Sequence, residues 1–202
     1  MRLAIMGNRP KELGGFKETI FHNAIKRRVA EILREQNPDI VYTTMSMGVD
    51  HWAAELCLES KIPYIACVPF LNYALVWTPK LRQRSKYLLR KAAKVIEVDR
   101  VRGYIHNTPP GVYHSSKIAT SRQYIIDQLV EDKDKLAVFF DSRESNDSPI
   151  NVARQYYSMQ YHKDYLIQIT SNMKECPMNL RNYWNTVLNR SNELIWMDDV
   201  PF

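Results

Sequence analysis

The chain has 202 residues, of which 45% are hydrophobic, and this is enough apolar surface to bury one core. The sequence contains neither an apolar run of membrane-spanning length nor a secretory signal, so we expect a cytoplasmic protein without a membrane partner. The formal net charge is +6, which is compatible with an acidic partner but does not decide the function. The three cysteines and five histidines lack metal-ligand spacing, so no metal and no cofactor is predicted.

Strands and helices alternate along the chain. We expect strands at 2–6, 40–45, 63–68, 94–98, 136–140 and 165–169, and helices near 17–36, 49–60, 80–94, 117–131 and 150–160. The strands are continuously apolar, which is typical of strands buried on both faces of a parallel sheet. The pattern predicts an α/β fold, namely a Rossmann-like, doubly wound, largely parallel sheet of about six strands with helices on both faces.

Two glycine-containing turns each follow an apolar strand, at 7–10 and at 46–50. In an open α/β sheet, the loops at the carboxyl ends of the strands form the ligand crevice. Four of the six glycines lie in or beside these two turns. Their concentration suggests backbone packed closely against a small molecule such as a nucleotide.

Three stretches resemble motifs of a known family. The segment Gly7–Gly14 is similar to the opening motif of the YpsA-like branch of the SLOG superfamily, which is Rossmann-like and includes DprA and the LOG phosphoribohydrolases. The segment Met47–Glu55, followed by Ile62–Tyr64 and Val68–Phe70, resembles the second motif of that branch, and Ser121–Asp127 resembles a third. The resemblance covers residues 1 to about 169, in order and at suitable spacing.

The resemblance implies a pocket for a nucleotide or a nucleotide-derived ligand, such as an NAD-like or ADP-ribose-like molecule. It also implies two activities, because relatives include sensors of such molecules and enzymes that cleave N-glycosidic bonds of nucleoside monophosphates. LOG-type hydrolases carry a glycine-rich phosphate loop, whereas the corresponding stretch Asp141–Pro149 contains no glycine. We therefore take binding or sensing as the leading hypothesis, and an N-glycosidase or nucleoside-transferring enzyme as the alternative.

Arginines and carboxylates near the turns are candidates for ligand contact. Arg9 could hold a phosphate or pair with Glu12. Arg122 falls in an otherwise apolar helical stripe, where a charge needs a partner, either phosphate or a carboxylate of Asp127 or Asp141. Asp50 begins a helix and could contact ribose hydroxyls or merely cap the helix.

Glu55, three residues after Trp52, could act as a general base or be an ordinary solvated helix residue. The candidate catalytic residues are Glu55 and Asp50. The predicted ligand-binding residues are Gly7, Asn8, Arg9, Pro10, Ser46, Gly48, Asp50, Trp52, Phe70, Trp77, Ser121, Arg122 and Asp141.

A basic helix and a group of polar aromatic residues are further candidates for ligand binding. The basic helix at 80–94 is either a solvated face or a DprA-like nucleic-acid-binding surface. The polar aromatics of the irregular stretch 99–116, which are Tyr104, His106, Tyr113 and His114, could stack on a base or form a lid.

The chain divides into a predicted nucleotide-binding domain, 1–169, and an extension, 170–202. The extension breaks the alternation of strands and helices but is too apolar to be disordered. We expect it to pack on the domain or on a partner subunit of a homo-oligomer.

Overall fold

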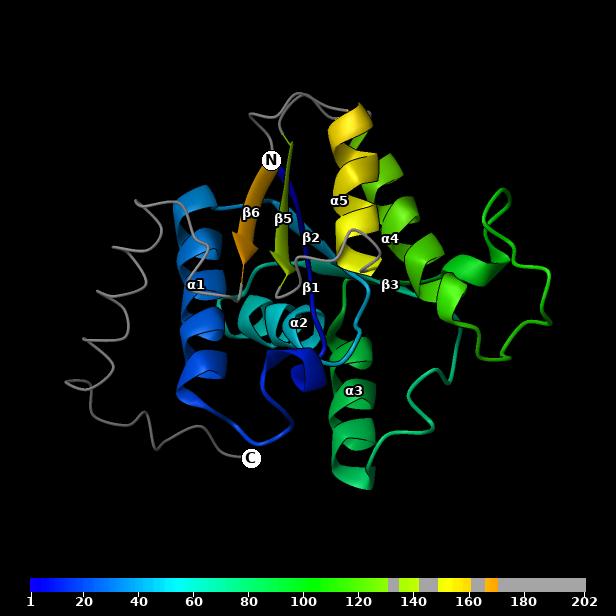
Figure 1. Cartoon of the computed structure of the whole chain (residues 1–202), viewed down its shortest axis with the longest axis horizontal. Coiled ribbons are helices and arrows are strands. Elements are labelled where there is room, and N and C mark those ends of the chain that lie inside the picture. The colour runs from blue at the N-terminus through cyan, green and yellow to red at the C-terminus, as the bar shows by residue number, and fades with distance from the viewer. Residues whose placement is uncertain (131–134, 142–148, 161–165, 171–202) are drawn as a thin grey trace.

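Six parallel strands form one sheet in the order β4-β3-β2-β1-β5-β6, with helices on both faces (Figure 1). This computed structural model describes residues 1–130, 135–141, 149–160 and 166–170. The strands are β1 (Arg2–Gly7), β2 (Ile40–Thr43), β3 (Tyr64–Val68), β4 (Lys94–Glu97), β5 (Lys135–Asp141) and β6 (Leu166–Thr170). The helices are α1 (Ile20–Gln36), α2 (Val49–Glu59), α3 (Pro79–Lys91), α4 (Ser115–Val130) and α5 (Pro149–Gln160). The predicted fold class is confirmed.

The apolar strands supply both faces of the sheet. Successive side chains of a strand point to opposite faces. Leu3 and Ile5 of β1 therefore join the core under α1, α2 and α3, whereas Ala4 and Met6 join the core under α4 and α5. All four side chains are fully buried. This two-sided burial is the physical reason that the strand sequences lack polar alternation.

Local signals set the ends of α1. The hydroxyl of Thr19 accepts a hydrogen bond of 3.2 Å from the N–H of His22 and so caps the first turn. Asn37 ends the helix in the left-handed conformation, with φ of 41°, and Pro38 follows it. The predicted boundary before Pro38 is confirmed.

Two predicted strands extend past the carboxyl ends of the observed ones. The strand expected at 40–45 ends at Thr43, and Met45 has a φ of 60°, which a strand cannot contain. The strand expected at 94–98 ends at Glu97, because Val98 begins the short 3-10 helix η2 (Val98–Arg100). A second 3-10 helix that the periodicity did not predict, η1 (Pro10–Leu13), follows β1.

Gly7 and Gly48 are required by contacts within the protein. A Cβ atom on Gly7 would lie 2.6 Å from the Cβ of Val49, and one on Gly48 would lie 2.4 Å from the carbonyl oxygen of Asn8. Gly48 also has a φ of 104°, which side-chain-bearing residues rarely adopt. The two glycine turns therefore pack against each other, and this contact accounts for the close approach that the sequence attributed to a ligand.

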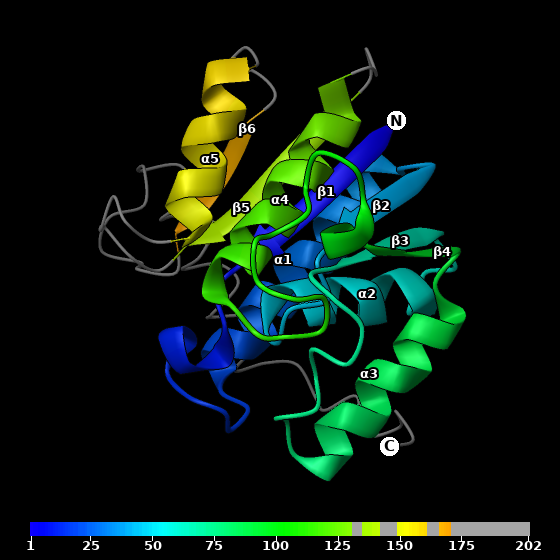
Figure 2. The same ribbon diagram turned by 90° about the vertical axis from the view of Figure 1, so that its right-hand side faces the viewer.

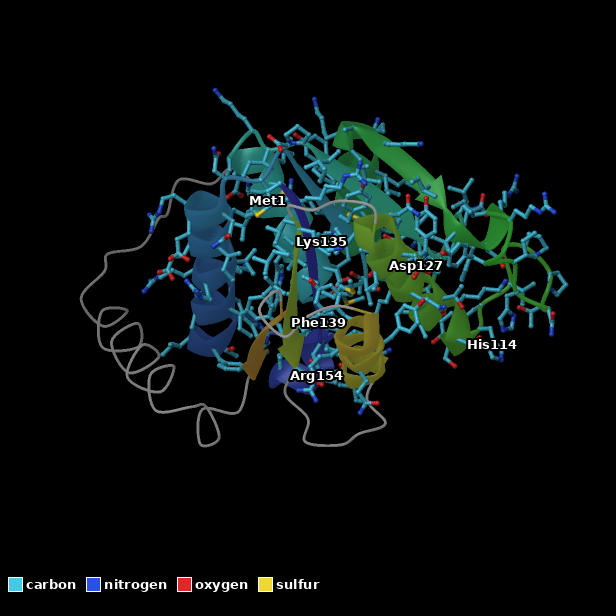
Figure 3. All side chains as sticks on the ribbon, turned by 90° about the horizontal axis from the view of Figure 1, so that it is seen from above. Met1, His114, Asp127, Lys135, Phe139 and Arg154 are labelled. Carbon is cyan, nitrogen blue, oxygen red and sulfur yellow. The ribbon has the colours of Figure 1, made fainter. Side chains whose placement is uncertain are left out.

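The strand order places a change of direction beside β1. The chain lays down β2, β3 and β4 on one side of β1 and then returns to form β5 on its other side. Met1 and Lys135 lie together at the amino edge (Figure 3), and Gly7 pairs with Phe140 near the carboxyl edge. In open α/β sheets, ligands bind outside the carboxyl ends of the strands at such a switch point.

None of the helices among the described residues is both long enough and apolar enough to cross a membrane.

We predict that Gly48→Ala destabilises the protein more than Gly14→Ala. Gly14 also has a positive φ, of 95°, but its added Cβ would meet no atom within 4 Å. Gly14→Ala should therefore lower the free energy of unfolding only by the left-handed backbone cost of about 1–2 kcal/mol. Gly48→Ala carries this cost and a backbone clash as well. Urea unfolding of both variants checks the difference, and equal losses would contradict the packing of the two turns.

Candidate functional site

The carboxylate of Asp50 lies fully buried at the carboxyl end of β1. Asp50 stands in the first turn of α2, and its Oδ2 accepts a hydrogen bond of 2.9 Å from the N–H of Gly7. Its Oδ1 accepts a short hydrogen bond from the hydroxyl of Thr44. The neighbouring hydroxyl of Thr43 donates to the backbone carbonyl of Asp50 at 2.9 Å. The carboxylate thus ties α2 to the ends of both β1 and β2.

Arg122 reaches the same residue of β1 from the opposite layer. Its side chain extends from α4, is 4% exposed, and donates from Nη2 to the carbonyl oxygen of Gly7 at 3.3 Å. Its buried Nε has no hydrogen-bond partner among the residues that the structure describes. Such an unpaired buried donor is rare, and it is one of the signs of a ligand or an ordered water.

Burial shifts the pKa values of both Asp50 and Arg122. Desolvation raises the pKa of Asp50, and the positive charge of Arg122 opposes this rise. Desolvation likewise lowers the pKa of Arg122, and the negative charge of Asp50 opposes that fall. Of the partners predicted for Arg122, Asp141 has only a minor electrostatic effect, whereas Asp127 accepts hydrogen bonds from two tyrosines. The charge of Asp50, which the sequence did not suggest as a partner, raises the pKa of Arg122 more than the charges of Glu12 and Asp141 do.

Arg9 adds a second guanidinium at the end of β1. Its side chain is 56% exposed, and its Nη2 lies 3.2 Å from Oε1 of Glu12. The other oxygen of Glu12 accepts from the N–H of Arg9 at 3.0 Å and from the side chain of Asn8 at 3.3 Å. Pro10 begins η1 and is buried. The predicted pairing of Arg9 with Glu12 is therefore present, and it leaves much of the arginine exposed.

The two guanidinium groups lie close enough to repel each other. The charge of Arg9 lowers the pKa of Arg122, whereas Glu12, Asp50 and Asp141 raise it. Asp141 ends β5 and is buried. The end of β1 therefore gathers two cations and three carboxylates, a concentration of charge that is typical of functional sites.

Two predicted serines lie in the same region but bond to the protein. Ser46 is 7% exposed and its hydroxyl can donate to the Oγ1 of Thr44, 2.8 Å away, whose own proton bonds to Asp50. Ser121 is fully buried and donates at 2.8 Å to the carbonyl oxygen of Lys117, within its own helix. Both hydroxyls lie near Asp50 or Arg122 in the chain, and their role in ligand contact stays a prediction.

The two predicted tryptophans lie on different sides of α2. Trp52 packs towards α1, where its ring centroid is 5.0 Å from that of His22 and 5.5 Å from Nζ of Lys26. Trp77, in the connection between β3 and α3, contacts the ring of His51 edge-on at 6.0 Å and that of Tyr73 at 5.3 Å. The structure does not bring Trp52 and Trp77 together.

Glu55 is held by an arginine of the neighbouring helix. Its Oε1 accepts from Nε of Arg84 at 2.9 Å and lies 3.6 Å from Nδ1 of His51. Burial lowers the pKa of His51, although the charge of Glu55 opposes this fall. The Nε2 atom of His51 has no hydrogen-bond partner among the described residues. No sequence pattern singles out His51, because an i, i+4 His–Glu spacing is common on helices.

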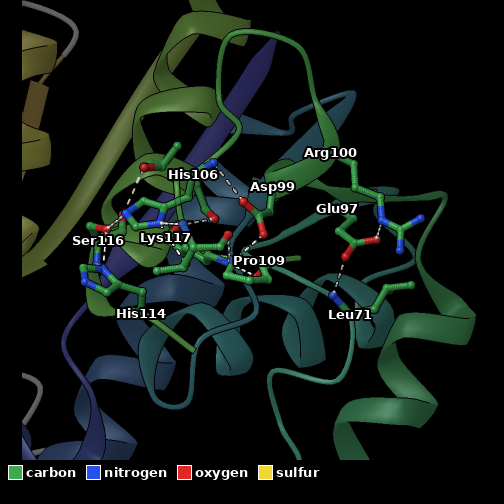
Figure 4. Close-up of polar contacts among 12 residues, drawn as sticks. Leu71, Glu97, Asp99, Arg100, His106, Pro109, His114, Ser116 and Lys117 are labelled. Atoms are coloured by element: carbon green, nitrogen blue, oxygen red, sulfur yellow. Dashed lines mark hydrogen bonds and ion pairs between the residues drawn. The ribbon is translucent and has the colours of Figure 1, made fainter. Parts of the chain in front are cut away.

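A buried ion pair fixes the segment between β4 and α4. Nζ of Lys117 donates to Asp99 at 2.7 Å and to the carbonyl of Pro109 at 2.9 Å (Figure 4). It also lies 5.4 Å from the ring centroid of Phe70. Phe70, a predicted ligand contact, is thus covered by a lysine. Burial alone would raise the pKa of Asp99, but hydrogen bonds from Lys117 and from the N–H of His106 hold the pKa below its ordinary value.

The polar aromatics of 99–116 are mostly engaged within the protein. His106 stacks on His114 at 4.6 Å, and both rings bond to the hydroxyl of Ser116. The hydroxyl of Tyr104 donates to Asp127 at 2.6 Å. Tyr113 is 60% exposed. His114 lies at the periphery of the molecule, beyond the start of α4 (Figure 3). Stacking on a base or closure as a lid stays a prediction for this group.

No cluster of potential metal ligands occurs within the described part of the chain. Cys57 and Cys67 are free and buried, and desolvation raises the pKa of Cys57 to about 12. Cys176, the glycine-free stretch 142–148 and most of the extension 170–202 lie outside the described residues.

The chain matches known proteins at the level of a family. The YpsA model, described as the YspA SLOG family, matches residues 3–174. The UPF0398 protein of Lactobacillus delbrueckii is 31% identical over 100 residues, which cover 45% of this chain and 54% of the relative. That of Brevibacillus brevis is 35% identical over 91 residues, covering 43% and 45%. The chain spans about half the length of these curated relatives.

Two solved structures match this chain only distantly. The molybdenum cofactor carrier protein of Chlamydomonas reinhardtii is 12% identical, with a TM-score of 0.38 over 83% of this chain and 87% of that one. Staphylococcus aureus MnaA, solved with UDP, is 10% identical, with a TM-score of 0.29 over 92% and 71%. Similarity at this level carries no argument about a ligand.

We predict that Lys117→Met lowers the free energy of unfolding by about 3–5 kcal/mol, because it leaves the carboxylate of Asp99 buried and unpaired. The double variant Lys117→Met/Asp99→Asn should recover much of this loss. Because the pKa of Asp99 is lowered on folding, the stabilisation is fully present above the ordinary carboxyl pKa and disappears as the pH falls below about 4. Denaturant unfolding from pH 7 to 3 checks this, and a single variant as stable as the double would contradict it.

Proposed function

This chain belongs to the YpsA SLOG family, and we propose that it binds a nucleotide or nucleotide-derived ligand, such as NAD or ADP-ribose, at the carboxyl edge of the sheet beside β1 and β5. Family membership suggests a nucleotide-related Rossmann-like function. The specific proposal is that Arg9 and Arg122 together hold the anionic part of the ligand.

The convergence of Arg9 and Arg122 at the end of β1 carries this proposal. Arg9 is exposed and Arg122 is buried, and each guanidinium lies in the positive field of the other. A phosphate between them would relieve that repulsion and give the buried Nε of Arg122 an acceptor. The switch point of the sheet is also the position at which an open α/β fold binds ligands.

Asp50 has a positioning role in this proposal. Both of its oxygens accept hydrogen bonds from the protein, and its side chain is fully buried. It compensates the charge of Arg122 and keeps that guanidinium at the carbonyl of Gly7. A ribose hydroxyl would reach this carboxylate only after a rearrangement of the turn that contains Thr44.

We favour binding over N-glycosidic hydrolysis because both candidate catalytic carboxylates, Asp50 and Glu55, are already engaged by other groups of the protein. A general base must lie within hydrogen-bond reach of the proton that it removes. Asp50 is enclosed, and Glu55 is held by Arg84 at 2.9 Å, on the side of α2 that faces α3. Asp50 lies at the end of β1 but is fully buried, and Glu55 is bound on the α3 side, whereas Arg9 is exposed at the end of β1.

We predict that Arg9→Ala weakens binding of AMP, ADP-ribose or NAD about tenfold or more, because a charge-assisted hydrogen bond contributes about 1.5–3 kcal/mol. Arg122→Lys should weaken binding similarly, since an ammonium cannot reproduce the planar fork. Isothermal titration calorimetry with this panel, and with adenosine as the ligand that lacks phosphate, measures the effect.

Arg34→Ala is the matched control, because Arg34 is exposed in the last turn of α1, at the opposite edge of the sheet. It removes the same charge and should leave affinity unchanged. Binding of adenosine as tightly as AMP, or equal losses in Arg9→Ala and Arg34→Ala, would sink the proposal. Release of free base from AMP, followed by chromatography, would favour the hydrolase instead.

A further inference from the structure

The outer face of α3 is a continuous basic stripe. Its exposed positions Lys80, Gln83, Lys86, Tyr87, Arg90 and Lys91 recur every three to four residues, which places them on one face of the helix. Lys94 of β4, also exposed, extends the stripe. The helix lies on the outer side of α2 (Figure 2), so this face points away from the sheet.

The sequence around this stripe contains no acidic residue. Between positions 60 and 96 there are eight lysines and arginines and no aspartate or glutamate. An ordinary solvated helix mixes the two signs of charge, because i, i+4 pairs of opposite sign stabilise it. Here the helix forgoes that stabilisation, and Glu55 of α2 pairs with Arg84 at the margin of the stripe.

An aromatic ring stands in the middle of the cations. Tyr87 is 37% exposed, the guanidinium of Arg84 lies 5.3 Å from its ring centroid, and Nζ of Lys91 lies 5.9 Å from it. These residues precede and follow Tyr87 by about one helical turn. Cation–π contacts with Arg84 and Lys91 keep the ring of Tyr87 within the stripe. A nucleic-acid base could stack on this ring while the neighbouring cations bind the phosphates.

We propose that this face of α3 binds single-stranded nucleic acid. The alternation of cations and an aromatic ring matches a strand whose phosphates and base faces are both accessible. A duplex would present its phosphates but not its base faces to Tyr87. An anionic membrane would require a free apolar helix face, and the apolar residue Leu88 of α3 is already buried in the core.

The site is distinct from the proposed nucleotide site at β1. It depends on lysines and arginines of α3 and on Tyr87, and on none of the residues at the switch point. A negative result for one of the two proposed sites therefore leaves the other proposal unaffected. Arg9→Ala should leave binding of a single strand intact, and variants of α3 should leave binding of AMP intact.

The test uses fluorescence anisotropy of the full chain with a labelled 20-nucleotide single strand, at several salt concentrations. Lys86→Glu/Arg90→Glu should weaken binding at least tenfold, and the slope of log K against log salt should become shallower by about 1.4, since each lost phosphate contact contributes about 0.7 on a single strand. The control Lys17→Glu/Arg34→Glu makes the same change of charge at exposed positions elsewhere and should bind within about twofold of the wild type.

Variants of Tyr87 separate stacking from charge. Tyr87→Ala should weaken binding about tenfold without changing the salt slope, whereas Tyr87→Phe should bind like the wild type. Thermal unfolding by circular dichroism confirms that each variant is folded. Equal losses in the two charge-reversal pairs, a Tyr87→Ala variant that binds normally, or preferential binding to duplex or to phosphatidylserine vesicles would each overturn the proposal.

Discussion

One residue of β1 joins the two helical layers of the molecule. Asp50 of α2 accepts the hydrogen bond of the Gly7 N–H, and Arg122 of α4 donates to the Gly7 carbonyl from the opposite face of the sheet. A carboxylate and a guanidinium are each costly to bury alone, and each offsets the cost of the other. The close packing of the two glycine turns brings α2 near enough to β1 for this arrangement. The positions of Arg9, Asn8 and Glu12 follow from it.

The fold was predictable because its signals are local. Continuous apolar strands indicate burial on both faces, and residues such as Pro38 mark where helices end. The strand ends were predicted wrongly where the backbone conformation of one residue, and not its apolar character, decides where the strand stops. Met45 is apolar and follows a strand, yet its positive φ ends β2 early, and no sequence pattern announces that a methionine will adopt it.

The site was predictable only in part, because its contacts join residues distant in sequence. The helical stripe correctly placed Arg122 in a buried position, but Asp50, whose charge opposes the fall in its pKa most strongly, belongs to a different layer and could not be chosen over nearer carboxylates. Of the four glycines in or beside the two turns, Gly7 and Gly48 lie close to other atoms of the protein, whereas Gly14 and Gly15 do not. The pair formed by Lys117 and Asp99 was missed, since a lysine near a helix start gives no sign that it is buried.

The proposed binding of phosphate depends on Arg122, whose buried Nε has no acceptor among the described residues. NMR of the arginine Nε–H resonances tests this most directly, with the Arg122 signal assigned by its absence in Arg122→Lys. Addition of AMP should shift that resonance, and addition of adenosine should not, because only the phosphate supplies an acceptor for the buried Nε. AMP that binds while the Arg122 resonance stays unchanged would contradict the central claim, because the ligand would then be held elsewhere.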